Sequence, residues 1–378
     1  MIQDLNSVVQ QEPKLNKMNT VTTHRARKKI IICFLLVSLV PISIVGVISF
    51  FNSRGTINKI SAQYSLDFLT QTVANIQLKL AEFENISLRL FINNDFNNTL
   101  INYLKIKDGA SELQKKVIVD YFNEYMISNQ DVFAFLFISE TKTDKSIIVA
   151  KDYYQDFLDL TKHFRQTSSY KSIIKAGGGI VWSTTIKLNR NHFVILGRYI
   201  KDLTTGQPLG ILAIVVDEDK IDQLVNMTIY NQLNISFSEI DNYLFIINNE
   251  GEIISSPFKE EIGKNINQIM KDTEPLKSIL GSPVSNRDYG CEINQGSYIT
   301  EVNHKQMLVT FKSIGSKIGV GGKSGWILVS LAPTSYLYKQ ASAISYTTLI
   351  LGIIFGILAI LASFYVANLV NNKSEDKK

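Results

Sequence analysis

The sequence has few of the residues that catalytic and metal sites need. It holds two cysteines, Cys33 in an apolar run and Cys291 in a polar stretch, so no disulfide framework is expected. Its four histidines are scattered without metal-ligand spacing, and there is no HExxH, no GxSxG and no cysteine beside a histidine. The sequence therefore predicts a protein that is not an enzyme, with no catalytic residues, no metal and no cofactor.

Charge is also scarce, since Asp, Glu, Lys and Arg make up 19% of the 378 residues. The net charge is +5, and much of the excess lies in a basic run that contains Arg25, Arg27, Lys28 and Lys29. The rest of the chain is nearly balanced, which argues against binding of nucleic acid. A hydrophobic content of 45% argues against disorder and, with the low charge, favours membrane segments.

Two long segments contain no charge at all. Residues Ile30–Phe51 and Ala343–Val366 are each long enough to cross a hydrocarbon core about 30 Å thick, so the lipid bilayer is an expected partner. The first is longer than the apolar part of a signal peptide, and no small-x-small cleavage site follows it. The basic run before it predicts a cytoplasmic N-terminus, and the second span returns the C-terminus to the cytoplasm. The region between the spans is then extracytoplasmic.

A long amphipathic helix is expected to follow the first span. Apolar residues recur at spacings of three and four from Ile57 to Leu90, with several short helices as the alternative. Further helices are expected over residues 111–128, 217–227 and 264–279, and residues 153–175 are helical or irregular. Strands are expected over residues 132–139, 147–150, 192–200, 210–216, 243–248, 252–255, 298–302, 306–313 and 326–331.

Part of this order occurs twice. FLFISETKTDKSIIVA from Phe135 is similar to LFIINNEGEIISS from Leu244, and GILAIVVDEDKI from Gly210 is similar to GWILVSLAPTSY from Gly325. We therefore expect an α+β fold, in which a long N-terminal stalk helix is followed by two tandem antiparallel-sheet modules and two transmembrane helices flank the whole. The strands are almost continuously apolar, which is typical of sheets covered on both faces.

This layout resembles the double Cache sensors of bacterial receptors, whose two modules are PAS-like. The resemblance covers about residues 25–370 and rests on the architecture and on short patterns such as IINNEGEIISS and GWILVSLAP. The run from RKKIIICFLL through the stalk resembles the outer halves of sensor histidine kinases of low-GC Gram-positive bacteria. It implies a small-molecule ligand bound in the membrane-distal module. It also implies a homodimer in the plasma membrane and a signal that passes along the helices, in chemotaxis or in a two-component system.

The expected boundaries follow from the spans and the modules. They are a cytoplasmic basic arm (1–29), a transmembrane helix (30–51), the extracytoplasmic sensor (52–342), a second transmembrane helix (343–370) and a cytoplasmic tail (371–378). The sensor divides into the stalk helix (52–93), the distal module (94–230) and the proximal module (231–342). No output domain fits into the tail, so we expect a truncated sensor kinase or chemoreceptor, or a chain that acts on a separate cytoplasmic signalling protein.

Five residues of the distal module are candidates for ligand binding. Arg198 shares a strand face with apolar residues, so it needs an anionic ligand or a carboxylate such as Asp202 or Asp217. Aromatic residues near the Gly177–Gly179 run either line a pocket or form ordinary core; they are Phe164, Tyr170, Trp182 and Tyr199.

Two features of the amino-acid-binding family members are missing. Those modules carry an Arg-x-Trp-Tyr run and an Asp in the last strand of the distal module. This chain has FRQTSSYK from Phe164, and Val215 stands where the Asp is expected. The sequence therefore does not identify the ligand.

A small-residue pattern in the second span predicts a dimer contact. Gly352 and Gly356 form GxxxG, which lets two helices approach closely in lipid. Two other functions stay open: an envelope scaffold or assembly protein that binds other proteins through its modules, and an extracytoplasmic enzyme anchored to the membrane.

Overall fold

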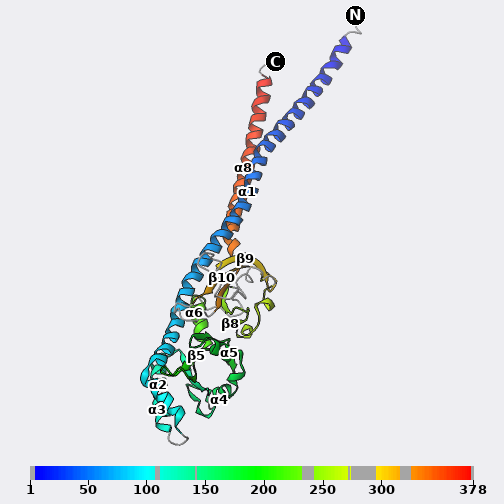
Figure 1. Cartoon of the computed structure of the whole chain (residues 1–378). Coiled ribbons are helices and arrows are strands. Elements are labelled where there is room, and N and C mark those ends of the chain that lie inside the picture. The colour runs from blue at the N-terminus through cyan, green and yellow to red at the C-terminus, as the bar shows by residue number, and fades with distance from the viewer. Residues whose placement is uncertain are drawn as a thin grey trace. The chain divides into compact units, whose positions relative to one another are not determined.

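The structure is a computed structural model that describes residues 5–106, 111–140, 143–231, 242–270, 273, 295–315 and 325–375 (Figure 1). The chain forms two compact units. One contains the two ends of the chain, Met1–Ser61 and Ser335–Lys378, and the other contains Ala62–Thr334.

The first unit is helical throughout its described residues. It contains the first part of α1 (Leu5–Ile92) and almost all of α8 (Thr334–Glu375), so both predicted spans are helical. Among the described residues, one window is long and apolar enough to cross a membrane, Leu349–Val366, with a mean hydropathy of 2.7. Gly352 and Gly356 lie in this window and are half-buried.

The predicted stalk helix is confirmed as part of α1, which is one helix and not several short ones. Within the second unit its buried positions follow spacings of three and four, as the sequence predicted. They are Leu69, Val73, Ile76, Leu80, Phe83, Ile86 and Leu90. The helix ends where Asn93 caps α2, since the Asn93 side chain accepts a hydrogen bond from the Phe96 N–H at 2.9 Å.

The distal module contains one antiparallel sheet of order β2-β1-β6-β5-β3, and β4 also pairs with β5. Its strands are β1 (Val132–Ser139), β2 (Ile147–Ala150), β3 (Ile180–Trp182), β4 (Ile186–Leu188), β5 (Asn191–Lys201) and β6 (Pro208–Asp217). Its helices are α2 (Asn94–Lys105), α3 (Glu112–Ser128), α4 (Tyr154–His163), α5 (Ser168–Lys175) and α6 (Glu218–Asn231), with 3-10 turns η1 (Thr143–Lys145) and η2 (Phe164–Gln166). Helix α2 and strands β3 and β4 were not predicted.

The proximal module repeats this arrangement, with the sheet order β8-β7-β11-β10-β9. Its elements are β7 (Tyr243–Ile247), β8 (Ile253–Ser255), η4 (Lys259–Glu261), η5 (Ile266–Gln268), β9 (Gln295–Val302), β10 (Lys305–Ile314) and β11 (Trp326–Pro333). The hairpin β7–β8 corresponds to β1–β2, and β11 corresponds to β6. The predicted internal repeat is therefore confirmed.

One predicted helix is wrong where the structure describes it. Residues 264–270 of the expected helix 264–279 hold only the short turn η5, and most of the remainder lies outside the described residues. The start of this segment bonds to the β7–β8 hairpin, and its own backbone bonds close only a short turn, such as the one from the Ile269 N–H to the Ile266 carbonyl at 3.0 Å. The Ile266 N–H donates to the Gly251 carbonyl at 2.8 Å, and the Ile253 N–H donates to the Lys264 carbonyl at 2.9 Å.

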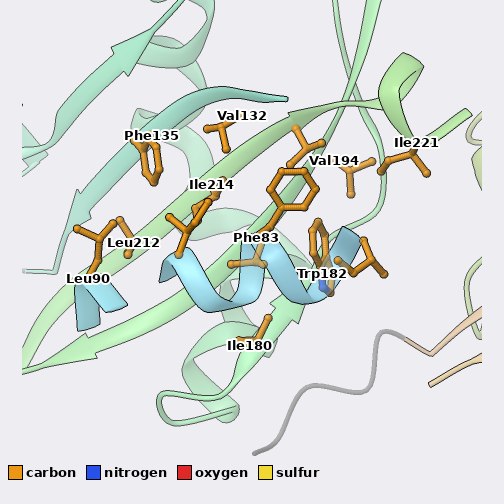
Figure 2. Close-up of a cluster of buried hydrophobic side chains, with 14 of the residues drawn as sticks. Phe83, Leu90, Val132, Phe135, Ile180, Trp182, Val194, Leu212, Ile214 and Ile221 are labelled. Atoms are coloured by element: carbon orange, nitrogen blue, oxygen red, sulfur yellow. The ribbon is translucent and has the colours of Figure 1, made fainter. Parts of the chain in front are cut away.

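The distal sheet is covered on both faces, as its apolar strands predicted. On the stalk face, Val132, Leu212 and Ile214 share one core with Phe83 and Leu90 of α1 (Figure 2). This core also includes residues of the proximal module such as Leu244 and Trp326, so α1 and both sheets are joined through it. On the opposite face, a separate core contains side chains from α4, η2 and α5, namely Phe157, Phe164 and Ile173.

Candidate functional site

The structure separates the five predicted ligand-binding residues onto the two faces of the distal sheet. Successive residues of a strand point to opposite faces, and Arg198 and Tyr199 are neighbours on β5. Tyr199 belongs to the core opposite the stalk, with Phe164 and Tyr170, whereas Trp182 belongs to the stalk-side core.

Arg198 is buried and is held by the stalk helix and a turn. Its Nε donates to Ser87 Oγ of α1 at 3.0 Å, and its Nη1 donates to the carbonyl of Gly178 at 2.7 Å. The guanidinium also lies 5.7 Å from the centre of the Phe91 ring. Burial lowers the pKa of Arg198, and the charge of Glu84 opposes this.

The predicted carboxylate partners of Arg198 are wrong. Asp202 instead accepts hydrogen bonds from the backbone N–H groups of Thr204 and Thr205 in the turn after β5. Asp217 accepts from the Asp219 N–H at 3.1 Å, at the start of α6. Both carboxylates therefore stabilise local turns, as short acidic side chains often do.

Trp182 connects three parts of the second unit. Its Nε1 donates to Glu84 Oε1 of α1 at 3.0 Å, and its ring meets Phe83 edge-on at 6.2 Å (Figure 2). On the other side it contacts Trp326 of the proximal module, with ring centroids 5.4 Å apart. These contacts make Trp182 part of the structural core between the helix and the two modules.

The other three predicted residues come together on the opposite face. Phe164 meets the Tyr170 ring edge-on at 6.3 Å. The Tyr170 hydroxyl donates to the carboxylate of Glu140, whose two oxygens are both 3.0 Å away. Tyr199 lies near them on β5, and Lys201 Nζ lies 5.6 Å from its ring centre.

Two further residues of this group were not predicted. Glu140 directly follows β1, and Arg165 lies in η2. Arg165 Nη2 donates to the carbonyls of Ser139 and Glu140, at 2.5 and 2.6 Å. Its Nε is buried and has no partner among the described residues. The arginine in FRQTSSYK is the sequence signal for Arg165.

We call Glu140, Phe164, Arg165, Tyr170 and Tyr199 the distal site. The charged side chains of this site shift the pKa values of its two tyrosines. Burial raises the pKa of Tyr170, and Glu140 adds to this while Arg165 opposes it. Burial and Glu140 also raise the pKa of Tyr199. Both phenols therefore stay neutral at physiological pH and remain hydrogen-bond donors.

Local geometry places α5, and with it Tyr170, close against the sheet. Thr167 Oγ1 caps α5 by accepting from the Tyr170 N–H at 3.2 Å. A Cβ on Gly197 would lie 2.2 Å from Ile173 Cδ1, so the glycine makes room for α5 on β5. Gly178, with φ at +115°, turns the chain from α5 into β3.

The distal site offers a carboxylate, a guanidinium and two phenol hydroxyls among aromatic rings. Such a set of a few polar groups on an apolar surface is typical of small-ligand sites. Among the described residues, no group of three His, Cys, Asp or Glu side chains is placed to hold a metal ion. The arrangement is suited to binding and orienting a molecule by hydrogen bonds and charge.

The chain belongs to the Cache domain family, since the model of the family's double form matches residues 53–341. This confirms the resemblance seen in the sequence.

Solved structures of similar fold are ligand-binding domains of bacterial chemoreceptors. The amino-acid chemoreceptor PctC of Pseudomonas aeruginosa PAO1, solved with GABA, is 14% identical, with 72% of this chain and 99% of that chain covered and a TM-score of 0.46. CtaA of Pseudomonas fluorescens, solved with L-isoleucine, is 14% identical, with 77% and 99% covered and a TM-score of 0.46. Tlp3 of Campylobacter jejuni, solved with 4-methylisoleucine, is 13% identical, with 75% and 94% covered and a TM-score of 0.47. At these values the likeness assigns no ligand and no residue role to this chain. No curated protein matches the sequence.

Proposed function

We propose that this protein is an extracytoplasmic small-ligand sensor of the bacterial plasma membrane and that its ligand binds at the distal site. The observation that carries the proposal is that four side chains lie together on the face of the distal sheet away from the stalk, namely those of Glu140, Arg165, Tyr170 and Tyr199. Membership of the Cache family supports a sensor rather than an enzyme.

The proposed topology is that of a two-pass membrane protein with both termini in the cytoplasm. Helices α1 and α8 would supply the spans at residues 30–51 and 343–370. Large apolar side chains on both helices are exposed, among them Val37, Phe51, Leu349 and Leu361, and a bilayer would cover them. Two copies would associate through α8 at Gly352 and Gly356, and the signal would pass through the spans to a cytoplasmic signalling partner.

The test is thermal unfolding of the full chain in lipid nanodiscs against amino acids, organic acids, amines, purines and sugars. A ligand at 100 times its Kd stabilises the folded state by about 2.7 kcal/mol, which raises the unfolding midpoint measurably. One ligand class should raise the midpoint. If every compound leaves it unchanged in a well-folded sample, the sensor proposal is wrong and an envelope scaffold becomes the better reading.

The proximal module supplies matched controls for the position of the site. Its Tyr243 hydroxyl donates to Glu261 Oε1 at 3.1 Å, which reproduces the Tyr170–Glu140 pair. Tyr170→Phe and Glu140→Gln should weaken ligand affinity about tenfold, the usual effect of losing one hydrogen bond to a charged group. Tyr243→Phe and Glu261→Gln should leave affinity unchanged. The reverse pattern would move the site to the proximal module.

A further inference from the structure

A buried ionic cluster joins the two modules away from the distal site. Glu218, the first residue of α6, directly follows the last strand of the distal module, and its side chain is fully buried. Its carboxylate accepts three hydrogen bonds, all from the proximal module. The donors are Ser255 Oγ at 2.5 Å, the Ser256 N–H at 3.2 Å and Lys259 Nζ at 2.5 Å.

Lys259 is shared among three carboxylates. Besides Glu218, its Nζ lies 2.8 Å from Asp219 and 3.1 Å from Asp222, whose side chain is also buried. We call these four residues the junction cluster. It brings three acidic groups around one ammonium; Glu218 and Asp222 are buried, whereas the side chain of Asp219 is 58% exposed. Two buried carboxylates beside one ammonium leave an excess of negative charge in the interior, which is unfavourable unless a group becomes neutral. Glu218 is the most buried of the three carboxylates, so it is the group for which neutrality brings the largest gain.

We propose that the junction cluster is a proton-sensitive contact between the modules, in which the closed junction binds a proton on Glu218 that an opened junction releases. Protons then act as a second input to the sensor, because a ligand that prefers one of two states shifts their populations. Lower external pH would favour the closed junction and higher pH would favour opening. The proposal does not depend on the ligand of the distal site.

The electrostatic surroundings agree with this direction. Burial raises the pKa of Glu218 from its ordinary 4.5 to about 7; the charge and hydrogen bond of Lys259 and the hydrogen bond from Ser255 oppose the shift, and the charge of Asp222 adds to it. A carboxyl with a raised pKa contributes stability that is complete below 4.5 and is lost as pH rises through about 7. Between pH 8 and pH 6 the ratio of closed to opened junction should therefore rise about tenfold.

Other titratable and charged groups lie on the elements around the cluster. Asp217 on β6 and His192 on β5 interact with the charges of Asp219 and Lys259, and Glu261 on η4 accepts from the Ser256 hydroxyl. Lys220 on α6, Lys187 on β4 and Glu260 on η4 act in turn on Asp217, His192 and Glu261. Burial and the charges of Lys187 and Lys259 lower the pKa of His192, so protonation of this histidine needs its own control.

The Ser256 N–H makes opening measurable, since it is bonded to Glu218. Hydrogen exchange of the full chain in nanodiscs, without ligand, would be followed by mass spectrometry on a peptide covering residues 253–262. After correction for the intrinsic rate, protection at pH 6 should exceed protection at pH 8 about tenfold. In Glu218→Gln protection should be the same at both pH values and should be high.

Two matched variants test whether Glu218 is the residue that binds the proton. Glu252→Gln changes another carboxylate of the same hairpin, which is bonded to Asn248 and not to Lys259, and it should keep the pH dependence. His192→Gln should also keep it. The proposal would be overturned if protection in the unmodified chain did not depend on pH. It would also be overturned if the pH dependence survived Glu218→Gln and disappeared in His192→Gln.

A second variant keeps the test decisive if Glu218→Gln does not fold. Lys259→Met removes the group that opposes protonation of Glu218, so the change in protection should move to higher pH by about one unit or more. A midpoint that stays in place or moves to lower pH would contradict the assignment to Glu218. Because the exchange measurement contains no ligand, its failure would leave the proposal for the distal site intact.

Discussion

The side chain of Asn226 takes the place of a missing strand partner, and its removal should be among the most destabilising single changes in the protein. Asn226 lies at a kink in α6, where the backbone is not helical (φ −106°, ψ 16°), and the side chain is 1% exposed. Its Nδ2 donates to the Leu244 carbonyl at 2.9 Å, and its Oδ1 accepts from the Leu244 N–H at 3.0 Å. Strand β8 pairs with β7 only from Ile246 onward, so Asn226 satisfies the backbone that β8 does not reach.

Asn226→Ala removes both bonds and a third one, from Nδ2 to Asp222 Oδ1 at 2.7 Å. Leu244 is buried, so water does not replace the lost partners without opening the core. Each buried polar group that loses its partner destabilises the fold by about 1–3 kcal/mol, which gives about 2–6 kcal/mol for the two backbone groups together. This is a large share of the roughly 5–15 kcal/mol that stabilises a typical domain.

The assay is urea unfolding of the full chain in detergent, followed by tryptophan fluorescence. The chain has two tryptophans, and they contact each other across the modules, so the signal reports on this region. Asn191→Ala is the control, because it removes one bond from a half-buried side chain to Tyr153 and should lower the free energy of unfolding by less than about 1 kcal/mol. Asn226→Asp keeps the acceptor but sets a carboxylate against a carbonyl, so it should be no more stable than Asn226→Ala. A loss for Asn226→Ala no larger than that of the control would refute the reasoning.

Three other changes have expected effects on thermal unfolding. Lys145→Met should lower the free energy of unfolding by about 1–3 kcal/mol, because the buried ammonium donates to three oxygen atoms around the ends of α2 and α3; an unchanged midpoint would contradict this. Gly210→Ala should destabilise by more than about 2 kcal/mol, since its Cβ would lie 2.3 Å from the rigid backbone oxygen of Ile138. Gly197→Ala should destabilise less and should be rescued by Ile173→Ala, because its Cβ meets only a side chain there; failure of the rescue would show that the backbone cannot accept the methyl group.

Much of the fold could be predicted from the sequence because its main elements are long and strongly apolar. The strand over residues 132–139 was predicted with the bounds of β1, and the repeated segments gave the correspondence between the two sheets. Strands β3 and β4 have three residues each, which is too short for a periodic pattern to appear. The helix expected over residues 264–270 is wrong because part of this backbone bonds to the β7–β8 hairpin. The helix propensity of the segment itself contains no information on such a partner.

The candidate site was only partly predictable, for a geometric reason. The prediction grouped aromatic residues by their closeness in sequence, which mixes the two faces of a sheet. Alternation along β5 separates Arg198 from Tyr199, and this could have been deduced. The face of Trp182 depends on its pairing with Leu196 in the register of β3 and β5, which the sequence does not contain. Glu140 belongs to the site only because the hydroxyl of Tyr170 on α5 donates to its carboxylate, and that is a tertiary contact.

The same alternation links the distal site to the stalk helix. Tyr199 faces the site, while the preceding residue, Arg198, donates to Ser87 of α1 and to the carbonyl of Gly178. Gly178 follows α5, which carries Tyr170, so the site is connected to α1 both through β5 and through the turn after α5. A ligand that repositions Tyr170 thus acts on α5. The turn after α5 contains Gly178, whose carbonyl accepts from Arg198, and Arg198 also donates to Ser87 of α1. A double-mutant cycle between Tyr170→Phe and Ser87→Ala would measure the energetic coupling along this path as a departure from additivity.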